Sequence, residues 1–266
     1  MKNQILSHFT TACPWRDTLY WYDTIDSTNT KAKALAKEGA PHGTVLIAGH
    51  QSGGRGRLGR SFSSPMGMGV YLSVILRPNC PGEDLMHLTC AAAVAMCNAV
   101  EKAAGFRPGI KWTNDLLYGK RKLGGILTEL CPNPSTGRID AAIVGIGINC
   151  CQTEADFPPE IRDMAISLSA ATGKPVSPAH LAGAMIESLV DMDRALLVKK
   201  EDILENYRKD CITLGQDIVL VRGDETAYGT AVDLDAEGGL IVRFRDGSVK
   251  TVTSGEVSIR GMYGYL

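Results

Sequence analysis

The spacing of apolar and polar residues changes near Thr213, and the two sides of this point predict different architectures. Before it, apolar stripes with the period of a helix alternate with short apolar runs typical of buried strands. Helices are expected over 31–37, 85–104, 178–197 and 201–209, and strands over 44–48, 70–76, 110–112, 123–130 and 139–148. This mixture predicts an α+β domain over residues 1–213, in which helices flank a mixed sheet.

Residues 214–266 instead show the pattern of short apolar runs that is typical of β-strands. Four short apolar runs, at 218–221, 227–234, 240–244 and 249–252, are separated by the turn signals Arg222-Gly223-Asp224, Glu237-Gly238-Gly239 and Asp246-Gly247. Such glycine-containing turns favour tight connections between antiparallel strands. This part predicts a small β-barrel of SH3-like type and a domain boundary between residues 213 and 214.

Composition narrows the classes of protein to consider. The 266 residues are 44% hydrophobic and carry a formal net charge of −1, so no overall field draws the protein to nucleic acid or anionic lipid. The amino terminus lacks the apolar segment of a signal peptide, and no apolar run is long enough to span a membrane, which predicts a cytoplasmic protein. The eight cysteines include no C-x-x-C pair, so we expect reduced, structural thiols.

The stretch Gly54-Arg55-Gly56-Arg57-Leu58-Gly59-Arg60 carries the strongest chemical signal. Arginine forks pair with phosphate or carboxylate oxygens, and glycines let backbone N–H groups approach the same oxygens. The stretch matches G-x-G-x-x-G and comes close to a Walker A loop, but both motifs need a helix to follow. The helix breakers at 61–69 argue against one, so we interpret the stretch as an anion clamp that connects two strands.

Other polar segments accompany this clamp along the chain. They are Ser27-Thr28-Asn29, Gln51, Lys111-Trp112-Thr113-Asn114-Asp115, Lys122-Leu123-Gly124-Gly125-Ile126-Leu127-Thr128-Glu129 and a predicted loop, Gly145-Ile146-Gly147-Ile148-Asn149. Together with the clamp they resemble the biotin protein ligases across nearly the whole chain, in that family's order and with similar spacing. The resemblance implies a catalytic domain with the fold that biotin ligases share with class II aminoacyl-tRNA synthetases.

The resemblance also implies a ligase that works in two steps. ATP and biotin give biotinyl-5′-adenylate and pyrophosphate, and a lysine of a biotin carboxyl carrier protein or of a carboxylase biotin domain then displaces AMP. Cations suit this chemistry because a carboxylate must approach a polyanion in the first step. Mg²⁺ is implied as well, although no carboxylate in the sequence identifies itself as its ligand.

Individual roles follow from the same resemblance. The catalytic candidates are Lys122, Arg57 and Arg55. The candidates for biotin binding are Ser27, Thr28, Asn29, Gln51, Gly54, Arg55, Gly56, Arg57, Lys122 and Gly125. The candidates for binding ATP and the adenylate are Arg57, Arg60, Phe62, Asn114, Asp115, Lys122 and Asn149.

Some of these residues have a second interpretation. Ser27 is equally typical of a helix N-cap, and the two roles are compatible. Asp115 either orients Asn114 or approaches a metal. Trp112 is more typical of a core or pocket wall than of a residue that reads a base.

Three residues depart from the usual pattern of the family. Thr113 stands where proline is common, Gly124 where alanine is frequent, and Phe62 where a tryptophan often stacks near the adenine. Neither Thr113 nor Gly124 removes a functional group. Phe62 keeps a smaller apolar ring, so it puts the affinity for the nucleotide in question more than the chemistry.

Two other functions stay open at this point. A lipoate protein ligase resembles the same catalytic fold, but its pocket does not need Gln51 and Ser27 to bind a urea group. A nucleic-acid-binding module with an Arg-Gly loop is disfavoured by the net charge and by the lack of a basic face interleaved with aromatic residues.

About 25 residues precede Ser27, too few for a three-helix DNA reader, so we expect no repressor role. Homodimers are common in the family, but no interface stripe stands out in the sequence.

Overall fold

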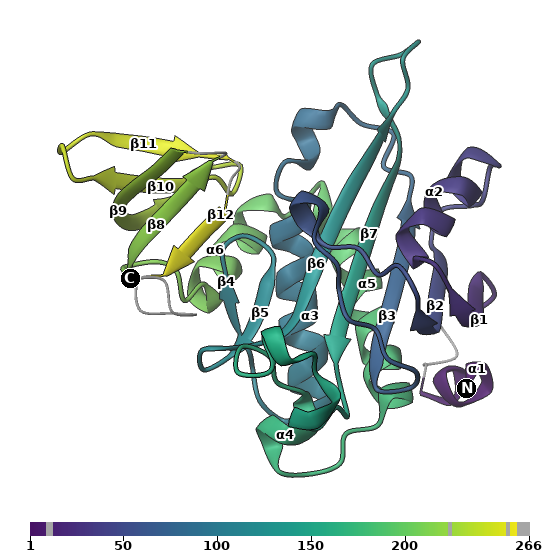
Figure 1. Ribbon diagram of the computed structural model, residues 1–266. Helices are drawn as coiled ribbons and strands as arrows, with labels where there is room; N and C mark the ends of the chain where they lie inside the picture. Colours follow the sequence, from purple (N-terminus) through teal and green to yellow (C-terminus); the bar gives the residue numbers. More distant parts are fainter. Residues whose placement is uncertain (9–12, 223–224, 254–255, 260–266) are drawn as a thin grey trace.

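The computed structural model describes residues 1–8, 13–222, 225–253 and 256–259 (Figure 1). A seven-stranded sheet has the order β1-β2-β3-β7-β6-β5-β4, and a five-stranded sheet has the order β11-β10-β9-β8-β12. The first sheet consists of β1 (Leu19–Ile25), β2 (Thr44–Gln51), β3 (Gly69–Leu76), β4 (Gly109–Lys111), β5 (Asp115–Tyr118), β6 (Arg121–Pro132) and β7 (Ile139–Asn149). The helices are α1 (Lys2–Ser7), α2 (Thr28–Lys37), α3 (Leu88–Ala104), α4 (Leu168–Thr172), α5 (Pro178–Leu196) and α6 (Lys200–Asp210).

Helices cover both faces of the seven-stranded sheet, as its strand sequences require. Along β2, Val45 and Ile47 belong to one hydrophobic cluster and Leu46 to another, because successive side chains point to opposite faces. The larger cluster joins the sheet to α3 and α5, and the smaller cluster joins it to α2. The pair β1/β2 is parallel and the other neighbouring pairs are antiparallel, so the predicted mixed sheet flanked by helices is confirmed.

Helix α3 lies in the middle of the core. Eleven of its seventeen residues are buried, including Cys90 and Cys97, and Gly105 ends it in the left-handed conformation that glycine favours. The helix begins three residues later than expected, because residues 82–85 form a separate 3₁₀ turn. All eight cysteines lie in the described residues and have free thiols, as their spacing predicted.

The clamp connects β2 to the antiparallel strand β3, as expected. Only a three-residue 3₁₀ turn, Arg57–Gly59, interrupts it, so the two glycine motifs that need a following helix are excluded by the structure as well. No described helix is both long and apolar enough to cross a membrane.

The carboxyl-terminal sheet consists of antiparallel strands. These are β8 (Asp217–Arg222), β9 (Glu225–Leu234), β10 (Leu240–Phe244), β11 (Val249–Val252) and β12 (Glu256–Ile259). Four of them were expected, and β12 was missed. Within the described strands no pairing joins β11 to β12, so the structure shows a separate antiparallel sheet but not a closed barrel. The SH3-like barrel and the boundary at residues 213 and 214 stay predictions.

Several side-chain contacts connect this sheet to the rest of the chain, among them an ion pair between Lys200 and Glu237. Trp112 donates from Nε1 to the carbonyl oxygen of Gly238, at 3.0 Å, and Arg208 of α6 pairs with Asp233 of β9, at 2.9 Å. The sheet therefore lies beside α6 and the β4 edge of the larger sheet (Figure 1). The sequence missed α1, β1, β5 and α4, which are short or, in β1, mix aromatic and polar residues at a sheet edge.

Candidate active site

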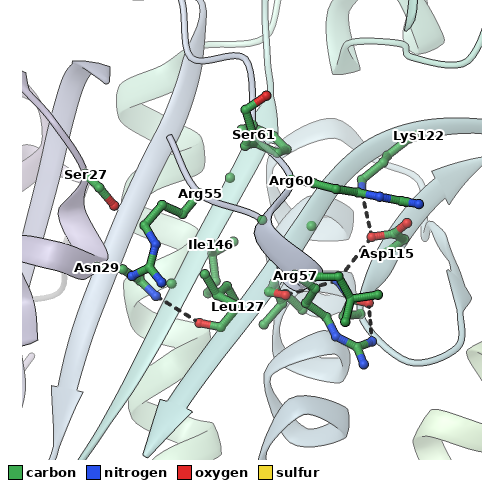
Figure 2. A pocket seen from close by; sticks show the side chains of 18 of the residues that line it. Ser27, Asn29, Arg55, Arg57, Arg60, Ser61, Asp115, Lys122, Leu127 and Ile146 are labelled. Atoms are coloured by element: carbon green, nitrogen blue, oxygen red, sulfur yellow. Dashed lines mark hydrogen bonds and ion pairs between the residues drawn. The ribbon is translucent and has the colours of Figure 1, made fainter. Parts of the chain in front are cut away.

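A cavity of about 150 Å³ lies between the clamp and the strands β6 and β7 (Figure 2). It brings together all the residues assigned from the sequence except Gly54 and Asn149. The assigned residues that line it are Ser27, Thr28, Asn29, Gln51, Arg55, Gly56, Arg57, Arg60, Phe62, Asn114, Asp115, Lys122 and Gly125. In Figure 2, Ser27, Asn29 and Arg55 lie on one side, and Arg57, Arg60, Asp115 and Lys122 lie on the other. The close placement of these residues is a finding, while their roles stay predictions.

The first side contains, besides Arg55, a network of neutral polar groups at the start of α2. Ser27 caps the helix by accepting a hydrogen bond from the backbone N–H of Thr30, at 3.5 Å. Gln51 Oε1 accepts from the backbone N–H of Thr28, at 2.8 Å, and its Nε2 donates to Ser64 Oγ, at 2.9 Å. These bonds fix the amide group at the cavity wall, where the local sequence alone gave it no partner.

Glycines of β7 make room for two neighbouring side chains. A Cβ atom on Gly145 would lie 1.8 Å from Asn29 Oδ1, and one on Gly147 would lie 2.5 Å from the Phe62 ring. The sequence segment 145–149 was described as a loop although it overlaps the strand expected over 139–148, and the structure places all of it inside β7. Glycine is needed there because another side chain packs directly on the strand, rather than for a turn.

The second side carries cations that are already held in place. Lys122 Nζ lies 2.6 Å from Asp115 Oδ1. Arg57 NH1 donates to Asn114 Oδ1, at 2.9 Å, and Asn114 Nδ2 donates to Asp115 Oδ1, at 3.2 Å. The chain of contacts from Arg57 to Lys122 thus fixes both cations before any ligand binds, which is the arrangement that stabilises developing negative charge.

A partly buried carboxylate, Glu129, supports the first side from outside the cavity lining. It accepts from Asn29 Nδ2, at 3.0 Å, and pairs with Lys33, at 2.7 Å, and with Arg55, at 3.2 Å. Burial acts to raise the pKa of Glu129, but the hydrogen bonds from Lys33 and Asn29 and the charge of Arg55 bring it below its usual range. Glu129 is therefore ionised at neutral pH. The sequence gave it no role.

The structure does not place Asn149 in the cavity lining, and its assignment to the adenylate stays a prediction. Its side chain is buried, donates to the carbonyl oxygens of Ile166, at 3.2 Å, and Lys122, at 3.4 Å, and accepts from Gln152, at 3.2 Å. The amide at the end of β7 thus ties the strand of Lys122 to the segment before α4. Its expected contact with the adenylate has no support in this geometry.

Gly54 also lies outside the lining. It is buried at the base of the clamp, where a Cβ atom would lie 2.3 Å from the carbonyl oxygen of Phe62. Its own carbonyl accepts from the backbone N–H of Phe62, at 2.9 Å. Gly54 therefore shapes the loop and does not face the cavity.

Asn149→Ala is expected to lower the free energy of unfolding by about 1–3 kcal/mol, because two buried carbonyl groups lose a donor. Its KM for ATP should change less than that of Asn114→Ala, which removes the partner of Arg57 in the cavity itself. Thermal unfolding together with KM for ATP checks both variants. A raised KM with an unchanged melting temperature in Asn149→Ala would instead support its assignment to the adenylate.

Sequence reasoning missed several residues of the site. Leu58, Ile126, Leu127 and Ile146 line the cavity without having been assigned a role, whereas the buried Trp112 lines it in agreement with the pocket-wall interpretation. Ser73 lies behind the lining, with its Oγ 2.7 Å from Thr28 Oγ1 and 2.6 Å from Asn29 Oδ1. Ser73 sits inside an apolar strand run, so nothing in its local sequence marks it.

The described residues contain no group of three or more His, Cys, Asp or Glu side chains placed to hold a metal ion. Asp115 is the one assigned carboxylate in the lining, and its Oδ1 forms an ion pair with Lys122. Mg²⁺ commonly binds through one or two carboxylates together with substrate phosphates. The donor set therefore fits a magnesium ion that arrives with ATP, and the predicted metal stays a prediction.

A mixed sheet that carries a cleft with fixed cations on one side and a neutral polar network on the other defines an enzyme that brings anionic substrates together. Residues 21–149 match the model of the biotin/lipoate A/B protein ligase family, and residues 213–260 match that of the biotin protein ligase C terminal domain.

Individual relatives agree with these matches. The bifunctional ligase/repressor BirA of Bacillus subtilis is 35% identical over 91% of this chain and 74% of its own length. The biotin–[acetyl-CoA-carboxylase] ligase of Mycobacterium tuberculosis is 29% identical over 87% of this chain and 85% of its own. A biotin protein ligase from Aquifex aeolicus, solved in complex with biotin and ATP, superposes with a TM-score of 0.76 and 31% identity, over 91% of this chain and 98% of that one.

The chain belongs to the biotin protein ligase family. The expectations of a ligase, with ATP and biotin as its substrates, are thereby confirmed.

Proposed function

We propose that the chain activates biotin with ATP in the cavity under the clamp and then transfers it to a lysine of a biotin carboxyl carrier protein. The observation that carries this proposal is the pair of fixed cations, Lys122 and Arg57, facing the polar network of Ser27, Thr28 and Gln51 across one cavity. One side suits phosphate and carboxylate oxygens, and the other suits the ureido group of biotin.

In the first step a carboxylate oxygen of biotin attacks the α-phosphorus of ATP, and the bond to the bridging oxygen of the β-phosphate breaks. Lys122 binds the biotin carboxylate and the α-phosphate, and Arg57 binds phosphate oxygens, which offsets the repulsion between the two anions. Arg60, exposed at the end of the clamp, is a further candidate for phosphate contact. Bound Mg²⁺ would neutralise charge on the phosphates.

In the second step the amine of the carrier lysine attacks the carbonyl carbon of the adenylate, the bond to the phosphate oxygen breaks, and AMP leaves. The amine loses a proton to solvent in this step. Positioning the amine against a mixed anhydride supplies much of the rate, and we assign no general base. Phe62 and Asn114 line the part of the cavity that we assign to the nucleotide.

The proposal extends to the surroundings of the enzyme. The carrier is the biotin domain of a carboxylase, and the enzyme acts in the cytoplasm. The carboxyl-terminal sheet closes into an SH3-like barrel. A homodimer is a further expectation, tested by the mass of the protein in solution.

Pyrophosphate exchange into ATP tests the function. Exchange should depend on biotin. It should not occur when lipoate replaces biotin or when neither acid is present. Exchange that depends on lipoate alone would make the chain a lipoate ligase, and exchange with neither acid, together with binding to a nucleic acid, would favour the binding module.

Arg57→Gly should release the adenylate about 10- to 100-fold faster, because a charge-assisted contact to the phosphate and the tie to Asn114 are both lost. The release appears as diffuse lysine labelling of bystander proteins. Leu58→Gly is the matched control: Leu58 is 70% exposed and has a φ of 55°, so this change adds glycine to the same turn without removing a cation. Labelling in Arg57→Gly as selective as in the original protein would contradict the role of Arg57.

A further inference from the structure

Glu129 connects three parts of the site without lining the cavity itself. It lies on β6, and its side chain is 16% exposed. Asn29 and Lys33 reach it from α2, and Arg55 reaches it from the clamp through two contacts, NH1 to Oε2 and NH2 to Oε1, both at 3.2 Å. The carboxylate therefore meets a cation from each of two separate segments.

The clamp is tied to itself more than to the sheet, so its position depends on a few side chains. Arg55 and Ser61 form an antiparallel bridge, and the backbone N–H of Gly56 donates to the carbonyl of Arg60, at 2.7 Å. These bonds join the two ends of residues 55–61 into one hydrogen-bonded unit. Arg55 ties the unit to Glu129 on one side of the cavity, and Arg57 ties it to Asn114 on the other.

The contact with Glu129 also restricts what Arg55 can do. A guanidinium that presents its two terminal nitrogens to a carboxylate has used the fork with which it would bind a phosphate. Asp115 and Asn114 hold Lys122 and Arg57 by single contacts, which leave the other donors of both cations for substrate. Arg55 thus differs from the other two cations of the site.

We propose that Glu129 is a positioning residue that holds the clamp closed through Arg55 and so retains the adenylate until the carrier lysine arrives. This inference rests on the proposed function, and it assigns Arg55 to closure of the site where the sequence suggested a catalytic cation. Lys33 stabilises the partly buried charge of Glu129 from the helix side and takes no part in closure.

The test compares Glu129→Gln, Arg55→Met and their double variant with Lys33→Met, which removes the other cation from the same carboxylate. Enzyme loaded with labelled biotinyl-adenylate is chased, and the label released to solvent is separated from the label transferred to a carrier domain. Glu129→Gln should release the adenylate about tenfold faster while exchange of pyrophosphate into ATP stays within about twofold. Arg55→Met should release the adenylate faster by a similar factor, the double variant should release it no faster than either single variant, and Lys33→Met should match the original protein.

The outcomes separate this inference from the proposed function. If the original protein shows no biotin-dependent exchange, the proposed function fails. Closure by Glu129 is wrong if Glu129→Gln shows normal pyrophosphate exchange and still retains the adenylate. It is also wrong if Glu129→Gln loses pyrophosphate exchange together with its retention of the adenylate. Additive losses in the double variant, or a leak in Lys33→Met, overturn it as well. If thermal unfolding shows that Glu129→Gln is not folded, the Arg55→Met variant alone decides the test. Full retention of the adenylate in Arg55→Met then overturns the inference.

Discussion

Lys122→Met is expected to reduce biotin-dependent pyrophosphate exchange by about 10²–10³-fold, the loss typical of removing one donor that stabilises transition-state charge. The ammonium group is held 2.6 Å from Asp115 Oδ1 at the cavity, so it meets the reacting anions without having to reorganise. Methionine keeps the length of the side chain but has no charge. The loss should therefore fall on kcat for exchange, with the melting temperature little changed.

Lys120→Met is the matched control for this prediction. Lys120 is exposed in the turn before β6, two residues from Lys122, so the same change there removes a charge outside the cavity. Exchange in this control should equal that of the original protein. If Lys122→Met retained exchange within about threefold, or if both variants lost it equally, Lys122 would not be the cation of the first step.

The carboxylates of this site position cations as much as they neutralise them. Asp115 fixes Lys122, and Glu129 fixes Arg55, in each case through a side chain from a strand of the same sheet. Without these partners, like charges around one cavity would repel each other and move apart. Anionic substrates then meet donors whose geometry has already been set, which reduces the reorganisation needed during the reaction.

The sequence predicted those parts of the fold and site that depend on local chemistry. Ser27 before an amphipathic run indicated a capped helix, and the glycines and arginines at 54–60 indicated a loop that binds anions between two strands. The main helices and most strands followed from their period. The short elements β5 and α4 did not, because four or five residues carry too little periodic signal.

What the sequence missed depends on contacts between distant segments. Nothing near Glu129 in the chain shows that Lys33 and Arg55 converge on it, nor does the apolar run around Ser73 show that its hydroxyl reaches Asn29. The contacts of Asn149 were missed for the same reason, because nothing in its local sequence shows that the fold brings the carbonyl of Ile166 to its amide. Strand pairing decides these cases, and it involves residues far apart in sequence.

Gly145→Ala is expected to raise KM for biotin by about 5- to 150-fold, the equivalent of the 1–3 kcal/mol that overpacking typically costs. The added Cβ would lie 1.8 Å from Asn29 Oδ1, and Asn29 is held by Ser73, Leu127 and Glu129, so it has no free direction in which to move. The strain therefore falls on the start of α2, where Ser27 and Thr28 line the cavity. Because Lys122 lies on another strand, kcat for exchange should change much less.

Two further variants decide whether steric overlap is the cause. Gly82→Ala adds the same methyl group where the nearest atom is 3.5 Å away, so its KM for biotin should stay that of the original protein. Asn29→Ala removes the atoms that the new methyl group would meet, and the combination of Gly145→Ala with Asn29→Ala should therefore bind biotin no worse than Asn29→Ala alone. If the two losses added in full, the effect of Gly145→Ala would arise from the strand itself, and the contact between β7 and α2 would not be what aligns the biotin side of the cavity.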